Sequence, residues 1–299
     1  MKTALHVVDI SPCVYAGSFN KRSFIQGMII NTPTGYRERN IPTGGTSILF
    51  NIIGNYSSTG PIVFVADRNP TIKKDSCGDY KGNRTHPDNV SVEKEVAEYI
   101  LSDCGFPIYA RDGYEADDLI YTIVAQNKRK YDHIFVHTAD SDLYLLVDDN
   151  VTILPTSSQA KLVTRDNYSY TCKKGKEIPY NSVVFRKFLE GDPSKNLEPL
   201  PKEERARLRS LFYTPARLPL LGNPRDIRIL MHRTFPEYDE RVNLFYPMYV
   251  DEVFEITRDF NYQRVKEWAY EIGNRVVHGT RGDLSAQIQE MLDRALYVE

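Results

Sequence analysis

Short apolar runs alternate with amphipathic stretches along the first half of the chain. The runs are rich in β-branched residues, which predicts strands at residues 5–10, 61–66 and 133–138. The stretches between and after them predict helices at residues 46–56, 90–103 and 115–128. Because strands and helices alternate, we expect an α/β fold with a mostly parallel central sheet flanked by helices.

The pattern changes twice along the chain. Residues 71–90 are polar and show little hydrophobic periodicity, which predicts an exposed connection followed by a helix. After Gly191 the chain is rich in proline and then mainly helical in pattern, with helices predicted at residues 202–211, 262–272 and 284–296. We therefore expect a core over residues 1–190 and a mainly helical region over residues 191–299.

Aspartates follow the predicted strands. Each of the three apolar runs ends at or just before one of them, namely Asp9, Asp67 and Asp140. The carboxyl ends of parallel strands form the ligand-binding edge of an α/β sheet. These three side chains are therefore expected to converge.

The strongest local signal is the run Glu115-Ala116-Asp117-Asp118 at the start of a predicted helix. Three carboxylates within four positions repel one another, so a cation would stabilise them. The helix dipole offsets part of that repulsion, by about 0.3–1 kcal/mol for each charge. Acidic capping of the helix is thus an alternative interpretation of this run taken alone.

Two weaker signals follow. Asp140 and Asp142 are two positions apart after an apolar run, which places both carboxylates on one side of an extended segment. Asp192 follows Gly191, which permits a tight turn. Taken separately, each of these patterns is also typical of an ordinary turn or loop. Taken together with the others, an oxygen-only set of acidic side chains suits Mg²⁺ or Mn²⁺ better than zinc.

Six motifs in chain order carry a family resemblance. They are Val8-Asp9, Phe64-Val65-Ala66-Asp67, Tyr80-Lys81-Gly82-Asn83-Arg84, Tyr114-Glu115-Ala116-Asp117-Asp118, Thr138-Ala139-Asp140-Ser141-Asp142 and Gly191-Asp192. Together they resemble the flap endonuclease/5′–3′ exonuclease family, which includes phage RNase H enzymes and the 5′-nuclease domain of bacterial DNA polymerase I. The motifs cover roughly the first two-thirds of the chain.

The resemblance implies a nuclease core with a divalent metal centre of one or two ions. Mg²⁺ is the expected cofactor, and Mn²⁺ is expected to substitute for it. The implied ligands of the first ion are Asp9, Asp67, Glu115, Asp117, Asp118 and Asp140. Those of the second are Asp142 and Asp192, with Asp140 nearby. The implied catalytic residues are Lys81, Arg84, Asp117, Asp118 and Asp140.

The resemblance also implies nucleic-acid contacts. Residues 71–103 match an arch-like segment, in which Lys81 and Arg84 would contact the scissile phosphate and Tyr80 would stack on a base. Gly44 and Gly45 match a loop near the junction of single strand and duplex, although helix capping explains that loop equally well.

The sequence departs from the family pattern after Gly191. Lys195 stands where the family has an aspartate of the second metal site, and an ammonium group cannot bind a cation. We expect a weakened second site, reliance on one ion, or assistance from Lys195 itself. The family's glycine-rich duplex-binding element is also missing. Arg205 and Arg209 are expected to contact phosphates instead, with solvated helix charge as the alternative.

Overall charge and composition change this picture little. A net charge of −2 does not indicate nucleic-acid binding, but an acidic active site can offset a local basic face. There is no apolar run of about 18 residues, so no membrane span is expected, and the dispersed cysteines fit a reducing cytoplasm, bacterial or in a phage-infected host.

The expected function is therefore a 5′–3′ exonuclease or flap endonuclease that removes 5′ flaps or RNA primers during DNA replication, with an RNase H-like activity in its range. The expected substrate is DNA or a DNA–RNA hybrid with a 5′ end or flap, and the expected partners are a replication polymerase or a single-strand binding protein. One alternative is a catalytically weakened module that binds branched DNA. The other is an RNase of the PIN type, which also uses clustered carboxylates.

Overall fold

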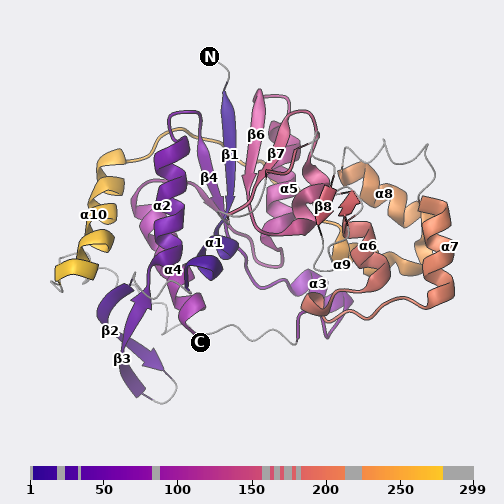
Figure 1. The fold of residues 1–299 in the computed structure, drawn as a ribbon, viewed down its shortest axis with the longest axis horizontal. Helices are drawn as coiled ribbons and strands as arrows, with labels where there is room; N and C mark the ends of the chain where they lie inside the picture. The colour runs from indigo at the N-terminus through magenta and orange to yellow at the C-terminus, as the bar shows by residue number, and fades with distance from the viewer. Residues whose placement is uncertain are drawn as a thin grey trace. The chain divides into compact units, whose positions relative to one another are not determined.

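The structure is a computed structural model of the chain. It describes residues 3–18, 24–32, 35–82, 88–156, 162–164, 169–171, 177–179, 183–212 and 224–278. Its central sheet has five parallel strands, in the order β5 (Ile108–Tyr109), β4 (Ile62–Val65), β1 (Ala4–Asp9), β6 (His133–His137) and β7 (Val151–Leu154). Figure 1 labels β4, β1, β6 and β7. This arrangement confirms the predicted α/β fold with a parallel sheet.

The chain divides into two compact units that interleave along the sequence. Unit 1 comprises residues 1–9, 67–85 and 109–255, and unit 2 comprises residues 10–66, 86–108 and 256–299. These units follow contacts within the fold, whereas the predicted boundary at residue 190 is a division by function. That functional division stays a prediction.

Unit 1 is built on strands β1 (Ala4–Asp9), β6 (His133–His137) and β7 (Val151–Leu154). Val7 of β1 pairs with Val136 of β6, and all three strands lie side by side (Figure 1). Helix α5 (Ala116–Asn127) packs on β1 with buried apolar residues such as Leu119 and Ile123. The short helices α3 (Thr71–Ser76) and η1 (Ser141–Leu146) belong to the same unit.

The rest of unit 1 is mainly helical. Its elements are β8 (Ser169–Thr171), β9 (Glu177–Pro179), α6 (Val183–Glu190), η3 (Pro193–Lys195), α7 (Lys202–Phe212), α8 (Pro224–Thr234), η5 (Pro236–Tyr238) and α9 (Asp239–Phe245). Aromatic rings of α6 and α9 form its apolar centre, where Phe188 meets Phe245 edge-on with ring centroids 6.2 Å apart. Both rings are buried.

Unit 2 contains helices α1 (Ile10–Ser18), α2 (Gly44–Tyr56), α4 (Asp88–Asp103) and α10 (Tyr262–His278). It also holds β4 (Ile62–Val65), the hairpin of β2 (Phe24–Thr32) and β3 (Gly35–Pro42), and the start of β5 (Ile108–Tyr109). Trp268 of α10 is buried and its indole N–H donates to Asp103 at the end of α4 (2.6 Å).

The predicted strands and helices agree with the structure where it describes them. The exposed connection predicted at residues 71–90 is wrong in part, because it contains helix α3 and two buried side chains, Lys73 and Tyr80. The three predicted strands correspond to β1, β4 and β6, and five predicted helices correspond to α2, α4, α5, α7 and α10. The helix predicted at residues 284–296 lies outside the described residues. Within the described ranges, no helix combines the length and the apolar character that crossing a bilayer demands.

Candidate active site

The predicted carboxylates all belong to unit 1, at the ends of its elements. Asp9 is the last residue of β1, Glu115 precedes helix α5, and Asp140 precedes the 3₁₀ helix η1. Asp67 follows a strand of the central sheet, and Asp192 precedes η3. The fold therefore gathers side chains that the sequence keeps far apart.

Four of these side chains, Asp9, Asp67, Asp117 and Asp140, form a group that we call the central carboxylates. Burial raises the pKa of Asp9 well above its usual range, and the charges of Asp67 and Asp117 raise it further. Burial likewise raises the pKa of Asp117, and the charge of Asp140 adds to this effect. Neighbouring negative charges thus oppose the ionisation of Asp9 and of Asp117.

Hydrogen bonds satisfy only part of this group. Thr138 donates its hydroxyl hydrogen to Asp9 Oδ2 (3.0 Å), and the Ala116 amide donates to Asp67 Oδ1 (2.8 Å). Asp9 Oδ1 is buried and has no hydrogen-bond partner within the described part of the chain. A buried carboxylate oxygen without a partner is costly, and it is also an available cation ligand.

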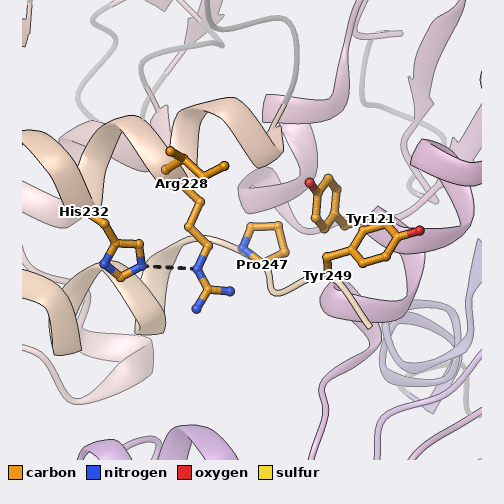
Figure 2. Close-up of a pocket in the computed structure, with 6 residues that line it drawn as sticks. Tyr121, Arg228, His232, Pro247 and Tyr249 are labelled. Atoms are coloured by element: carbon orange, nitrogen blue, oxygen red, sulfur yellow. Dashed lines mark hydrogen bonds between the residues drawn. The ribbon is translucent and has the colours of Figure 1, made fainter. Parts of the chain in front are cut away.

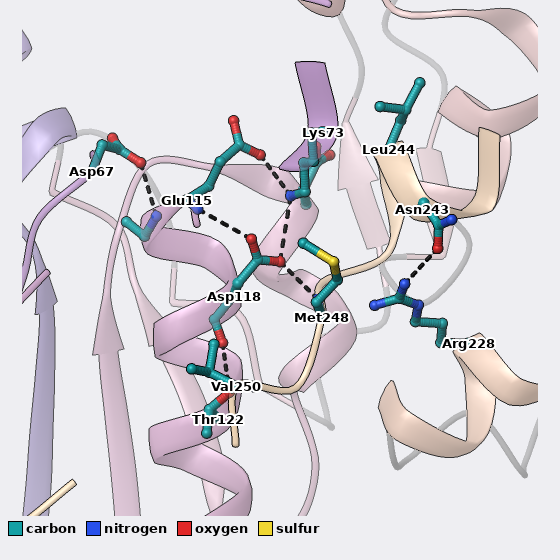
Figure 3. Close-up of polar contacts among 12 residues, drawn as sticks. Asp67, Lys73, Glu115, Asp118, Thr122, Arg228, Asn243, Leu244, Met248 and Val250 are labelled. Atoms are coloured by element: carbon teal, nitrogen blue, oxygen red, sulfur yellow. Dashed lines mark hydrogen bonds and ion pairs between the residues drawn. The ribbon is translucent and has the colours of Figure 1, made fainter. Parts of the chain in front are cut away.

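Glu115 and Asp118 have a different environment, because a buried lysine holds them (Figure 3). Lys73 Nζ lies 2.6 Å from Glu115 Oε2 and 3.4 Å from Asp118 Oδ1. Both oxygens of Asp118 also accept backbone N–H bonds, from Met248 at 2.7 Å and from Glu115 at 3.1 Å. Lys73 and Lys81 hold the pKa of Glu115 well below its usual range despite its burial. These contacts make Asp118 a buried positioning group for the start of α5.

Tyr80 and Lys81 contact the same glutamate. The Tyr80 hydroxyl donates to Glu115 Oε2 (3.0 Å), and Lys81 Nζ forms an ion pair with Glu115 Oε1. The Tyr80 side chain is 1% exposed, so its ring has no free face for the base stacking expected from the sequence. Its contacts indicate a positioning role. The Lys81 side chain remains 20% exposed, on a backbone with φ of 56° that non-glycine residues rarely adopt.

Asp142 and Asp192 face two other lysines. Lys187 Nζ lies 2.5 Å from Asp142 Oδ1 and 3.7 Å from Asp192 Oδ2. Lys195 Nζ lies 3.0 Å from Asp142 Oδ2 and donates to the Leu244 carbonyl (3.2 Å). These ammonium groups hold the pKa of Asp142 below its usual range.

A tight loop fixes Asp192 and Lys195. Gly191 has φ of 76°, and a Cβ there would lie 2.4 Å from the Leu197 carbonyl oxygen, so only glycine fits. The Asp192 amide donates to the Leu197 carbonyl (2.9 Å), and the Lys195 amide donates to the Asp192 carbonyl (2.9 Å). The sequence predicted this turn, but not the ion pairs that join Asp192 to Lys187 and Lys195 to Asp142.

The central carboxylates offer oxygen ligands of the kind that the predicted divalent cation needs. Oxygen-only side chains, mutual repulsion and the unpartnered Asp9 Oδ1 fit a hard cation at the central carboxylates. In the described part of the chain, no three His, Cys, Asp or Glu side chains are already arranged around a common metal position. The chemistry of the central carboxylates therefore fits such a cation, although their present arrangement is not a finished coordination shell.

The other predicted residues lie apart from the carboxylates or outside the described ranges. Arg84 is among the residues that the structure does not describe. Gly44 and Gly45 begin helix α2 in unit 2, and both are buried. On α7, Arg209 pairs with Glu190 (2.8 Å), and Arg205 is partly buried. Phosphate contacts by these residues stay predictions.

A small cavity of about 170 Å³ lies elsewhere in unit 1 (Figure 2). It is lined by Tyr121, Arg228, Ile229, His232, Pro247 and Tyr249. None of the predicted site residues lines it, so the central carboxylates and this cavity are separate features.

Comparison with known proteins identifies the family. Residues 5–173, more than half of the chain, match the family described as 5′-3′ exonuclease, N-terminal resolvase-like domain. The chain belongs to this family. Of the central carboxylates, all four fall within the matched region of this 5′-3′ exonuclease domain, whereas Lys187, Asp192 and Lys195 fall beyond it.

Relatives of the domain include DNA polymerase I of Caldicellulosiruptor bescii, which is 31% identical over 60% of this chain. A protein named 5′-3′ exonuclease from Aquifex aeolicus is 30% identical over 52% of the chain. The matched regions span 22% of the polymerase and 51% of the exonuclease.

A similar solved structure is T5 5′-exonuclease with bound zinc ions, with a TM-score of 0.53 and 15% identity, covering 97% of this chain and 98% of that one. T5 D15 flap endonuclease in a complex with DNA and metal ions gives a TM-score of 0.51 at 15% identity, over 97% of this chain and 99% of that one. These likenesses show a shared fold.

Proposed function

We propose that the chain is a divalent-metal-dependent 5′ nuclease that hydrolyses phosphodiester bonds near a 5′ end or flap. The observation that carries this proposal is the group of central carboxylates, in which burial and the charges of neighbouring carboxylates raise the pKa values of Asp9 and Asp117. Membership of the 5′-3′ exonuclease family supports the reaction class. Mg²⁺ is the proposed ion, with Mn²⁺ as its substitute.

The cation would be held by Asp9, Asp67, Asp117 and Asp140. Such an ion activates a water for attack and offsets the charge that develops on the phosphate. Thr138 would keep Asp9 oriented through its 3.0 Å hydrogen bond, and the 2.8 Å bond from the Ala116 amide would keep Asp67 at the start of α5. The bond to Asp9 leaves its buried Oδ1 for a cation or its bound water.

Lys81 is the proposed phosphate contact. Its ammonium is partly exposed and forms an ion pair with Glu115, which is itself buried. Because Glu115 keeps Lys73 as a second partner at 2.6 Å, Lys81 can turn toward a substrate phosphate without leaving that carboxylate unpaired. Arg84 is proposed to act with Lys81, and Arg205 and Arg209 to contact the duplex.

The proposed biological task is the removal of 5′ flaps or RNA primers during DNA replication, in contact with a polymerase or a single-strand binding protein. The substrate is proposed to be DNA or a DNA–RNA hybrid, and an RNase H-like activity is included. Polymerase and exonuclease relatives support this setting.

The test uses a 5′-labelled flap duplex with Mg²⁺, Mn²⁺ or EDTA. Wild-type protein should cut at the junction only with metal, and Asp117→Asn should lower the rate by about 100-fold or more, or about 2.7 kcal/mol. Asp112→Asn is the matched control, because Asp112 is exposed in the same unit and lies just before the acidic run.

Other outcomes identify the alternatives. Tight binding of the flap duplex without cleavage in either metal would favour a catalytically weakened DNA-binding module. Cleavage of plain single-stranded RNA in preference to the flap would favour a PIN-type RNase. A primer hybrid with an RNA 5′ end, assayed beside the all-DNA flap, separates primer removal from flap removal.

A further inference from the structure

The second group of carboxylates already has cations of its own. Asp142 is held at both oxygens, by Lys187 at 2.5 Å and by Lys195 at 3.0 Å. Asp192 faces Lys187 through Oδ2 at 3.7 Å, while its Oδ1 accepts bonds from the Ser194 amide and hydroxyl at 2.9 and 2.7 Å. Asp142 Oδ2 and Asp192 Oδ2 are buried without a hydrogen bond in the described part of the chain, but each lies within ion-pair distance of a lysine. Each acidic oxygen of this group therefore has a positive or hydrogen-bonding neighbour.

Lys195 is built into the protein. Its side chain is 5% exposed, and its ammonium donates to the Leu244 carbonyl. Nζ also lies 5.5 Å from the Phe245 ring centroid and 5.9 Å from that of Tyr80, distances at which an aromatic face stabilises a cation. Withdrawing this ammonium would leave Asp142 with one partner and open a space lined by aromatic rings.

Lys187 contacts the other oxygen of Asp142. It lies on helix α6, and its side chain remains 29% exposed while its ammonium contacts Asp142 and Asp192. One lysine is therefore fixed inside the protein and the other reaches solvent.

A divalent ion does not fit this group as it stands. An ion bound to Asp142 would have to displace Lys187 or Lys195, and an ammonium group left beside the ion would repel it. Displacing either lysine would break an ion pair of the buried Asp142 carboxylate, which is strongly unfavourable. Within the described residues, neither Asp9 nor Asp117 forms an ion pair with a lysine.

We propose that Lys187 and Lys195 take the place of a second divalent ion, so that the protein binds one divalent ion, at the central carboxylates. This inference rests on the proposed function, because it assumes that the central carboxylates bind metal. The two lysines supply a permanent positive charge beside Asp140 and Asp142, and the partly exposed side chain of Lys187 allows its charge to act on a substrate phosphate.

The test counts bound ions, independently of nuclease activity. Mn²⁺ is titrated into metal-free protein, and free Mn²⁺ is measured by electron paramagnetic resonance, with calorimetry as a second readout. Wild-type protein should bind about one Mn²⁺ per chain. Lys195→Asp and, separately, Lys187→Asp should each bind about two, because each replaces one blocking ammonium with a carboxylate whose negative charge offsets the ammonium that remains.

Lys130→Asp is the matched control, since it makes the same charge change at an exposed position of unit 1 and should leave the count at one. Circular dichroism confirms folding of each variant. If Lys195→Asp does not fold, Lys187→Asp at its more exposed position carries the test.

The outcomes separate this inference from the proposed function. Two ions in the wild type, or one ion in folded Lys187→Asp, would overturn the inference and leave the proposed metal site intact. No ion in the wild type would instead reject metal binding at the central carboxylates, and the inference would fall with it. One ion in the wild type and two in the lysine variants would support it.

Discussion

Replacing Lys73 with methionine should strongly destabilise unit 1. The Lys73 side chain is 3% exposed, and its ammonium lies 2.6 Å from Glu115 and 3.4 Å from Asp118, which are as deeply buried. Methionine keeps the apolar stem but removes the charge, leaving two buried carboxylates short of a partner. Breaking a buried ion pair at one side costs about 3–5 kcal/mol. Because Lys81 still pairs with Glu115, we expect about 3 kcal/mol, the lower end of that range.

The assay is urea denaturation of metal-free protein at pH 7, followed by circular dichroism. Lys74→Met is the control, because Lys74 is the next residue of the same helix and is exposed, and its ammonium donates a hydrogen bond to Oδ1 of the exposed Asn69 (2.8 Å). Its effect should stay within about 0.5 kcal/mol, as is usual for surface positions.

The pH dependence gives a second check. Lys73 and Lys81 lower the pKa of Glu115 in the folded state, so the stability that Glu115 contributes is present above its unfolded value near 4.5 and is lost as pH falls. The difference between wild type and Lys73→Met should therefore shrink below about pH 4.5. The reasoning is refuted if Lys73→Met is no less stable than Lys74→Met, or if the difference does not change with pH.

Three further predictions concern buried groups outside the carboxylates. Burial raises the pKa of Glu93 to about 7, so the stability that protonated Glu93 contributes is lost as pH rises through 7. In urea denaturation, Glu93→Gln should therefore stabilise the protein by roughly 1–3 kcal/mol at pH 8 and not at pH 4.5. Gly45→Ala should lower the melting temperature, at a cost of about 1–3 kcal/mol, because its Cβ would lie 2.4 Å from Val14 Cα. His6 and His137 have pKa values lowered by burial to about 4 and about 3, so neither imidazole should titrate above pH 5 in nuclear magnetic resonance spectra, and stability should fall as pH drops below 6.5.

Much of the fold could be predicted because periodicity is a local property. The run before Asp9 is an apolar strand in the sequence and β1 in the structure, and the acidic run at Glu115 begins helix α5 as expected. The hairpin of β2 and β3 was missed, since its residues were not recognised as paired strands. The Pro33-Thr34-Gly35 sequence between its two runs is the turn signal that could have revealed it.

The site was less predictable, because its charges are balanced by residues from other elements. Nothing in the spacing of Lys73 or Lys187 marks either as a partner of buried carboxylates, and both read as ordinary helix cations. The sequence predicts that Tyr80 stacks on a base, but its hydroxyl donates a hydrogen bond to Glu115 and its ring is buried. Only Lys195 gave a sequence signal, as a cation in place of an expected acid.

The distribution of lysines divides the eight predicted metal-binding carboxylates into two kinds. Those paired with lysines have a fixed counter-charge that chelators cannot remove, as at Asp142 and Glu115. Those without such a pair, such as Asp9 and Asp117, have raised pKa values, and a bound cation would stabilise their ionised forms. An ammonium group neutralises charge but cannot activate a bound water as a divalent ion does. On the proposed function, the lysine-paired group can therefore serve only binding and electrostatic stabilisation, and activation of the attacking water has to occur at the central carboxylates.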